Sequence, residues 1–349
     1  MKVAVIGCGT IANIAHIPSY VKNPEAEIKY FCDILPERAQ KAVAEYGCGT
    51  AITDYREVLK DPEIVAVSVC TPNNAHAEIA IAAMKAGKHV LCEKPAARTY
   101  AEALEMKKAQ NETGKVLNIG VVNRYNKAVN RIKEIIDAGE LGDIYHVYVS
   151  FRAHRSIPGL GGDFTTHAVS GGGVLIDWGV HYLDIVMYCC GDPAVKSVSG
   201  EVFCKLGVDM KNYVFENMWA GPPKPEGTYD VDDSMTALVR TEGPVISVSG
   251  AWAENIKDGG KFIDFMGEKA GIRLQYGGDF TVYTTKDGKL HEYKPEFEKA
   301  DMFQDEIDAF VRCITTGEKQ PSHIDTVIVT AQMMQAIYDS AAQHKEITL

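Results

Sequence analysis

Several features that mark whole classes of protein are absent from this 349-residue sequence. It has no C-x-x-C pair among its nine cysteines, no proline-rich linker and no low-complexity run, and we expect no N-terminal export signal. Scattered cysteines inside apolar runs indicate reduced, buried thiols rather than a disulfide framework. The most apolar helical stretch, about residues 174–190, carries Asp177, His181 and Asp184 and is too polar to span a bilayer. We therefore expect a cytoplasmic protein with no membrane partner.

Positive charge is scarce as well. Lys and Arg number 36 against 47 Asp and Glu, so the formal net charge is −11. Such a charge repels a phosphate backbone unless a local patch reverses its sign, and the densest basic cluster is only Arg152, His154 and Arg155. The sequence therefore predicts no nucleic-acid partner.

The residues that are present describe an ordinary globular protein of two domains. Apolar residues make up 46% of the chain and charged residues 24%, which is common globular usage. The length is more than twice the ~150 residues typical of one domain. Residues 1–122 and 123–349 differ in their patterning, so we place the predicted boundary between them.

Short β-branched runs alternate with helical segments in the first 120 residues, which predicts a doubly wound parallel sheet of the Rossmann type. The expected helices Pro36–Tyr46, Ala75–Ala86 and Thr99–Thr113 each stop at a glycine, as helices commonly do. The expected strands are Val3–Ile6, Ile28–Cys32, Ala51–Thr53, Ile64–Cys70, His89–Cys92 and Val116–Ile119.

A glycine turn follows the first of these strands directly. Gly7 permits a tight turn, Gly9 lets the backbone approach a pyrophosphate, and Ala12 allows close packing of the next helix on the strand. Main-chain amides of the intervening residues Thr10 and Ile11, aided by the helix dipole, complete the expected anion site. The turn therefore predicts a bound dinucleotide.

The cofactor preference is predicted from Asp33, which ends the second strand. Its carboxylate can accept both ribose hydroxyls of an adenosine and would repel a 2′-phosphate, which favours NAD over NADP. Two alternatives stay open: Asp33 as a solvated turn residue before Pro36, and Arg38 as a partner for a 2′-phosphate.

Two further segments follow strands of the same sheet, and ligands bind at that edge of such sheets. Thr71, Pro72, Asn73 and His76 come after the fourth strand, and the run Glu93–Pro95 comes after the fifth. We expect both segments to line the nucleotide cleft. A solvated strand-end lysine is the alternative interpretation of Lys94.

The alternation stops after about residue 123, and an antiparallel pattern replaces it. We expect a second α+β domain with a large, open, mostly antiparallel sheet and helices on one face. Two amphipathic helices, Asp301–Thr316 and Ile324–Gln343, end the chain, and the last is expected to pack back on the first domain. The expected strands are Ile144–Arg152, Ala194–Lys205, Ser234–Arg240, Val245–Ala253, Lys261–Met266, Gly271–Leu274 and Phe280–Thr284.

A second cluster of polar residues follows the triple glycine Gly171–Gly173. Asp177 and His181 are four residues apart, so on an α-helix they share one face, with Asp184 one turn further along. A carboxylate one turn from an imidazole can orient it and raise its basicity. The alternative is an interior histidine with satisfied hydrogen bonds. These three residues form no recognised metal-ligand spacing, so we expect no metal.

Together these motifs resemble the glucose–fructose oxidoreductase, inositol dehydrogenase and rhizopine-catabolism family of sugar dehydrogenases. The resemblance spans nearly the whole chain. It rests on four ordered motifs, which are Gly7-x-Gly9-x-x-Ala12, Thr71-Pro72-Asn73 with His76, Glu93-Lys94-Pro95, and Asp177-x-Gly179-x-His181-x-x-Asp184. It implies an N-terminal Rossmann domain and a C-terminal sheet that commonly mediates oligomers, hence a homodimer or homotetramer.

The resemblance also implies an activity: hydride transfer between a secondary hydroxyl of a sugar, sugar derivative or cyclitol and NAD(P). Lys94, Asp177 and His181 match the family's catalytic trio, and Arg124 and Tyr125 match a segment that often borders the nicotinamide pocket. We expect His181 to act as the base and Lys94 to stabilise the developing alkoxide. The expected substrate-binding residues are Lys94, Tyr125, Arg152, His154, Arg155, Asp177 and His181.

Two other functions are compatible with the same fold. An NAD-dependent deglycosylating enzyme would oxidise a sugar hydroxyl transiently, eliminate the glycosidic substituent and then reduce the product. A non-catalytic regulator would bind NAD without turning it over, although the presence of Lys94, Asp177 and His181 argues against it.

Overall fold

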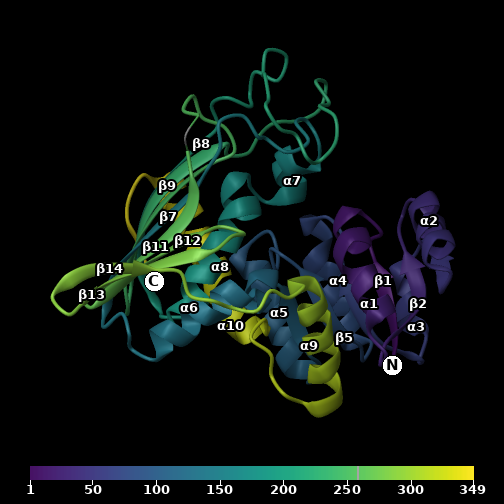
Figure 1. Ribbon diagram of the computed structural model, residues 1–349. Helices are drawn as coiled ribbons and strands as arrows, with labels where there is room; N and C mark the ends of the chain where they lie inside the picture. The colour runs from purple at the N-terminus through teal and green to yellow at the C-terminus, as the bar shows by residue number, and fades with distance from the viewer. Residues whose placement is uncertain (258) are drawn as a thin grey trace. The chain divides into compact units, whose positions relative to one another are not determined.

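Apolar runs near the start of the chain form a parallel sheet, and those of the second half form a mostly antiparallel one (Figure 1). The computed structural model describes residues 1–257 and 259–349. The chain forms two compact units. Unit 1 comprises Met1–Tyr125 and Ala300–Ile328, and unit 2 comprises Asn126–Lys299 and Val329–Leu349.

Unit 1 is built on a six-stranded parallel sheet in the order β3-β2-β1-β4-β5-β6. Central strands such as β1 and β4 are apolar on both faces because helices cover both sides of such a sheet. The order reverses direction at β1, which is the point where ligands bind in doubly wound folds. The strands are β1 (Lys2–Ile6), β2 (Glu27–Cys32), β3 (Thr50–Ile52), β4 (Ile64–Val69), β5 (His89–Glu93) and β6 (Leu117–Gly120).

The helices of unit 1 include one from the C-terminal part of the chain. This helix, α9 (Met302–Thr316), is capped by Asp301 and packs on α1, η1 and η2. The first residues of α10 (Ile324–Gln343) also belong to unit 1. The others are the π-helix η1 (Ala12–His16), α1 (Ile17–Lys22), α2 (Pro36–Tyr46), α3 (Tyr55–Lys60), α4 (Asn73–Lys85), α5 (Tyr100–Thr113) and the 3₁₀-helix η2 (Val122–Tyr125).

Unit 2 is built on a nine-stranded sheet in the order β14-β13-β12-β11-β7-β10-β9-β8-β15. Its strands pair antiparallel except β7 with β10, which run parallel. The strands are β7 (Ile144–Arg152), β8 (Val195–Phe203), β9 (Ser234–Thr241), β10 (Val245–Ala251), β11 (Lys261–Gly267), β12 (Ala270–Gln275), β13 (Phe280–Lys286), β14 (Lys289–Tyr293) and β15 (Ile347–Thr348).

Helices cover one face of this second sheet. The inward residues of β7 and β10, such as Val149 and Val248, join one core with α6 (Lys127–Asp137), α8 (Val180–Cys189) and the later residues of α10. Residues that alternate with them, such as Ser247, are only partly buried and lie on the other face. The short η3 (Asp163–Thr165), α7 (His167–Ser170) and π-helix η4 (Leu175–Gly179) precede α8.

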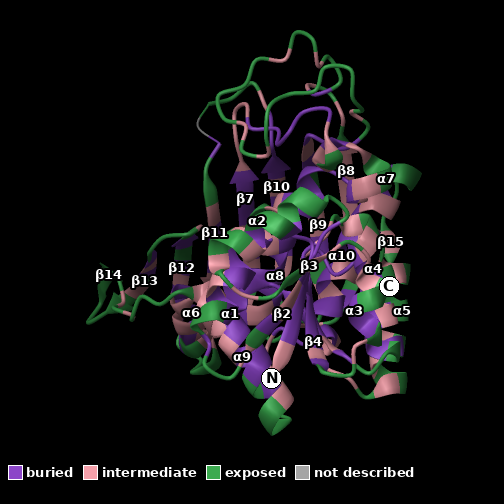
Figure 2. Cartoon of the chain, turned by 90° about the vertical axis from the view of Figure 1, so that its right-hand side faces the viewer, coloured by how far each residue is buried: buried purple, intermediate pink, exposed green. Residues whose placement is uncertain are grey.

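The predicted fold class is confirmed, and each predicted strand is present with its ends shifted by at most two residues. The sequence did not predict β14 or β15. All five residues of β14 are exposed (Figure 2), so it has no apolar alternation, and β15 has only two residues. The predicted helix near 174–190 is present as the π-helix η4 followed by α8.

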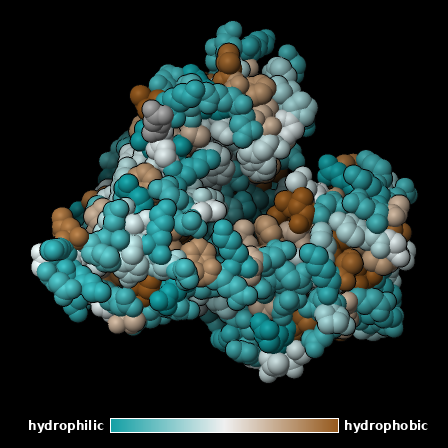
Figure 3. Space-filling model, viewed as in Figure 1, coloured by the Kyte–Doolittle hydropathy of each residue, from teal (hydrophilic) through white to brown (hydrophobic). Residues whose placement is uncertain are grey.

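The surface drawn in Figure 3 is mostly hydrophilic, with small and separate apolar patches. Among the residues that the structure describes, we find no helix with the length and hydropathy that a bilayer crossing requires.

Candidate active site

The predicted glycine turn joins β1 to η1. Gly7 adopts a left-handed φ of 91°, and its amide donates to the Cys32 carbonyl at 2.7 Å. A Cβ on Gly7 would lie 2.5 Å from the Cys70 carbonyl oxygen, whereas a Cβ on Gly9 would meet no atom within 4 Å. Ala12 is fully buried at the start of η1. The turn is therefore closed on the sheet side and open beside Gly9, which fits a close-lying pyrophosphate. Thr10 is exposed and Ile11 is partly buried.

Asp33 is tied to this turn by its carboxylate. One oxygen accepts the Cys8 amide at 2.9 Å, and the other accepts the Leu35 amide at 2.9 Å. The side chain is buried, so its oxygens are fixed relative to the turn. A carboxylate offers about four acceptor positions, which leaves room for ribose hydroxyls.

The loop after β4 and the segment after β5 are joined by His76. Its ring is buried, with Nδ1 2.8 Å from the Pro95 carbonyl oxygen and Nε2 2.9 Å from the Thr71 carbonyl oxygen. Burial lowers the pKa of His76 below its ordinary value. His76 thus joins the main chains of two segments that are predicted to bind the cofactor. Thr71 and Asn73 are partly buried, and Pro72 is exposed.

Glu93 and Lys94 end β5 and begin the following segment. The buried Glu93 carboxylate accepts the Lys94 amide at 3.0 Å and lies 2.9 Å from Nε2 of the buried His16. The pKa of Glu93 is lowered although burial acts in the opposite direction, because His16 and Lys94 favour its charged form. The Lys94 side chain is partly buried. No sequence pattern pointed to His16, because it lies 77 residues from Glu93.

Arg124 and Tyr125 lie in η2 and are both buried. The Arg124 guanidinium donates to the Pro321 carbonyl and to the Thr326 hydroxyl, each at 2.9 Å. The Tyr125 hydroxyl lies 2.8 Å from that of Ser322. Within unit 1 both side chains therefore bind the segment that precedes α10 or its first residues, and their contact with a cofactor or substrate stays a prediction.

Asp177, His181 and Asp184 lie on η4 and α8 of unit 2. Asp177 is buried in the π-helix, and His181 is partly buried in the first turn of α8. The His181 ring lies 6.4 Å from that of Tyr276, which stacks on Tyr182 at 4.3 Å. Asp184 is buried and accepts the Thr330 hydroxyl at 3.3 Å, so it points to α10.

The glycine run before η4 is explained by protein atoms. A Cβ on Gly172 would overlap the Tyr338 hydroxyl, and a Cβ on Gly173 would overlap the main chain of Asp232. Close approach of Asp232 and Tyr338 therefore accounts for Gly172 and Gly173.

Asp232 fixes the start of the helix that carries Asp177. Its buried carboxylate accepts the amides of Gly173 at 2.7 Å and Leu175 at 3.0 Å, and the hydroxyl of Tyr338 at 2.9 Å. Burial raises the pKa of Asp232 above its ordinary value, although the three donors act in the opposite direction. Sequence analysis missed this residue because its partners are 57 to 106 residues away.

Asp232→Ala is expected to lower the free energy of unfolding by about 2–4 kcal/mol, because three buried donors lose their acceptor. The loss is measured by urea denaturation followed by circular dichroism. Asp209→Ala, which removes an exposed carboxylate of the same unit, serves as the control and should change stability little. Equal stability of the two variants would contradict the assigned role.

The predicted substrate residues Arg152, His154 and Arg155 each have a partner within unit 2. Arg152 pairs with Glu254 through two contacts of 3.0 and 2.9 Å, and His154 Nδ1 lies 3.1 Å from Glu216. Arg155 donates to the Asn255 side chain. Their role in substrate binding stays a prediction.

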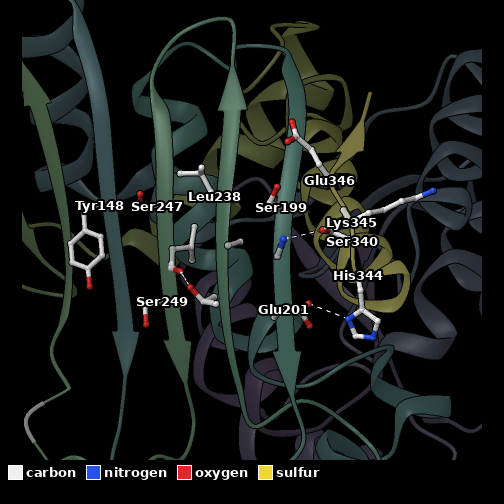
Figure 4. A pocket seen from close by; sticks show the side chains of 14 residues that line it. Tyr148, Ser199, Glu201, Leu238, Ser247, Ser249, Ser340, His344, Lys345 and Glu346 are labelled. Atoms are coloured by element: carbon white, nitrogen blue, oxygen red, sulfur yellow. Dashed lines mark hydrogen bonds and ion pairs between the residues drawn. The ribbon is translucent and has the colours of Figure 1, made fainter.

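A groove of about 660 Å³ lies on the face of the unit 2 sheet that α6, α8 and α10 leave uncovered. Figure 4 shows Tyr148, Ser247 and Ser249 on the strands and His344 beside Glu201, with a distance of 3.2 Å between Nδ1 and Oε1. None of the predicted site residues lines it. The described residues also contain no group of three or more His, Cys, Asp or Glu placed to hold a metal ion.

Comparison with known proteins identifies the family. The model of an oxidoreductase family with an NAD-binding Rossmann fold matches residues 1–121, and the model of the GFO/IDH/MocA C-terminal domain matches residues 129–273. A D-glucoside 3-dehydrogenase of Escherichia coli strain K12 is 31% identical over 352 positions, which cover 100% of this chain and 97% of that protein. The chain belongs to the GFO/IDH/MocA oxidoreductase family.

Other relatives in the comparison agree with this assignment. A levoglucosan dehydrogenase of Pseudarthrobacter phenanthrenivorans is 33% identical over 63% of this chain and 57% of that protein. A solved levoglucosan dehydrogenase in complex with NADH and levoglucosan has a TM-score of 0.84 at 24% identity, covering 100% of this chain and 99% of that one. This structural likeness supports the fold. The predictions of the family and of an NAD(P)-dependent oxidoreductase are confirmed.

Proposed function

We propose that the protein transfers a hydride between a secondary hydroxyl of a sugar, sugar derivative or cyclitol and NAD. The observation that carries the proposal is the full-length similarity to D-glucoside 3-dehydrogenase. The order of the glycine turn, the Glu93-Lys94-Pro95 segment and the Asp177–His181 pair supports it further.

The residues of unit 1 fit a dinucleotide. The open side of the glycine turn at Gly9 would take the pyrophosphate, and the fixed Asp33 carboxylate would accept the ribose hydroxyls. The segments that His76 joins, together with Glu93, would line the rest of the site. When bound, the nicotinamide accepts or returns the hydride.

We assign the proton chemistry to three side chains. His181 takes the proton of the substrate hydroxyl as general base. The Lys94 ammonium donates a hydrogen bond to the same oxygen and stabilises the negative charge that develops there. Asp177 orients these groups and the substrate. The proposal requires Lys94 and His181 to act on the oxygen of one substrate hydroxyl.

The proposal also includes a cofactor preference and an oligomeric state. A fixed negative charge at Asp33 disfavours a 2′-phosphate, so NAD is preferred over NADP. We also propose that the protein acts in the cytoplasm as a homodimer or homotetramer. The sheet face that carries Tyr148, Ser247 and Ser249 is then the contact between subunits, because helices cover the opposite face.

A panel of sugars, glycosides and cyclitols assayed with NAD and NADP tests the proposal. We expect stoichiometric NADH from at least one free sugar or glycoside and a higher kcat/KM with NAD than with NADP. Release of nitrophenol from a nitrophenyl glycoside without net NADH would instead indicate the deglycosylating enzyme. Cofactor binding without turnover of any compound would indicate a regulator and overturn the proposal.

A further inference from the structure

Buried polar groups of unit 1 form a series of close contacts that ends at the main-chain amide of Lys94. The Tyr20 hydroxyl lies 2.9 Å from the Ser68 hydroxyl, which lies 3.1 Å from Nδ1 of His16. Nε2 of His16 lies 2.9 Å from Glu93, whose other oxygen accepts the Lys94 amide. The groups come from η1, α1, β4 and β5, so this series of contacts links the first helices of the unit to the main chain of Lys94.

A second buried carboxyl group lies on α9, the helix that packs on η1 and α1. Glu306 is 2% exposed, and its Oε1 has no hydrogen-bond partner among the described residues. The helix packs on η1, α1 and η2, and the charge of Glu93 acts directly on Glu306. The mechanism assigned above gives Glu306 no role, and an acidic residue this deeply buried requires an explanation.

Two carboxyl groups in one dry region cannot both be ionised without a large penalty. Glu93 is 7% exposed and has His16 and the Lys94 amide as partners, which stabilise its charged form. Burial raises the pKa of Glu306 well above its ordinary value, and the charge of Glu93 raises it further. These influences favour the uncharged form of Glu306 and the charged form of Glu93.

The remaining titratable groups around Glu306 leave this assignment unchanged. Glu306 acts electrostatically on Tyr20, Cys70 and Tyr125, and burial raises the pKa of each, which favours their neutral forms. Arg124 favours the charged form of Tyr125 but is a minor influence on it. His16 and Lys94 act on Glu93.

We propose that Glu306 is a positioning residue for Lys94: from α9 it supports the buried region around Glu93, which in turn fixes the main chain of Lys94. The inference rests on the proposed role of Lys94. A second negative charge at Glu306 would repel Glu93 and loosen the segment that presents the lysine.

The test uses two variants of Glu306 and one control. Glu306→Gln keeps a neutral polar group of the same shape, Glu306→Leu keeps only the bulk, and Glu318→Gln removes an exposed carboxylate just beyond the same helix. At neutral pH we expect Glu306→Gln to retain kcat within about twofold. Glu306→Leu should lower kcat about tenfold, with little change in the sugar KM or in NADH affinity. Equal kcat in both variants, or equal losses in both, would overturn the proposal.

The pH dependence of melting gives a readout that does not need activity. The unfolded chain releases the Glu306 proton at the ordinary value for glutamate, whereas the folded chain retains it at higher pH. Wild-type stability is therefore lost as pH rises through this window, and the Gln variant lacks this loss. The Tm of Glu306→Gln minus that of wild type should increase between about pH 5 and about pH 9, while the difference for Glu318→Gln stays flat.

A flat difference for Glu306→Gln would show that Glu306 ionises like an exposed acid and would overturn the proposal. If wild type converts no compound of the panel, the proposed function fails. The pH series of melting temperatures then tests the charge state of Glu306 without an activity assay. A Tm difference between Glu306→Gln and wild type that increases with pH supports the uncharged acid, and a constant difference overturns it.

Discussion

Lys94→Ala and His181→Ala are each expected to lower kcat/KM for the sugar by about 10²–10⁴-fold. The first removes the cation that stabilises the developing alkoxide, and the second removes the base that takes the hydroxyl proton. Because the two groups act on one oxygen, the double variant should lose much less than the product of the single losses. Steady-state kinetics with the best substrate of the panel measures all three.

The same variants should bind NADH almost as tightly as wild type, which fluorescence titration checks. Lys41→Ala, which removes an exposed lysine of α2, is the matched control and should retain full activity. Wild-type kcat/KM in either single variant would contradict the assigned role of that residue. Additive losses in the double variant would contradict the claim that Lys94 and His181 act on the same atom.

Gly7→Ala is expected to destabilise the protein by about 2–4 kcal/mol. The new methyl group would lie 2.5 Å from the Cys70 carbonyl oxygen, and the residue would need a left-handed φ of 91°. Neither the β1–η1 turn nor the end of β4 can move without breaking sheet hydrogen bonds, such as that from the Gly7 amide to the Cys32 carbonyl. Urea denaturation measures this loss.

Gly9→Ala tests cofactor binding at the same turn with little expected effect on folding stability. Its methyl group would meet no protein atom within 4 Å, so stability should change by less than about 1 kcal/mol. The methyl would stand where we place the pyrophosphate, so NADH affinity should fall at least about tenfold. Wild-type NADH affinity in Gly9→Ala would contradict the placement of the cofactor, and a Gly7→Ala variant of normal stability would contradict the turn geometry.

Strands and turns that are determined by residues close together in the sequence could be predicted. The strand before Gly7 and the aspartate after the second strand predict a nucleotide site, because alternation and turn chemistry are local properties. β14 escaped prediction because every residue of it is exposed, so it has no apolar periodicity to detect.

The supporting groups of the site could not be predicted in this way. His16, Asp232 and Glu306 become significant only when the fold brings distant segments to Glu93 or to the start of η4. Spacing alone did not reveal that Asp177 lies in a π-helix, because the i, i+4 argument assumed an α-helix. It also could not reveal the hydrogen bond from the Thr330 hydroxyl to Asp184.

The central claim is direct hydride transfer from a sugar carbon to NAD. Its most direct test is to incubate the protein with NAD and a sugar or glycoside deuterated at every carbon, and to analyse the NADH formed by mass spectrometry. The account predicts one deuterium in each NADH and one carbonyl in each oxidised sugar. NADH without deuterium, or loss of the glycosidic substituent with no NADH formed, would contradict it.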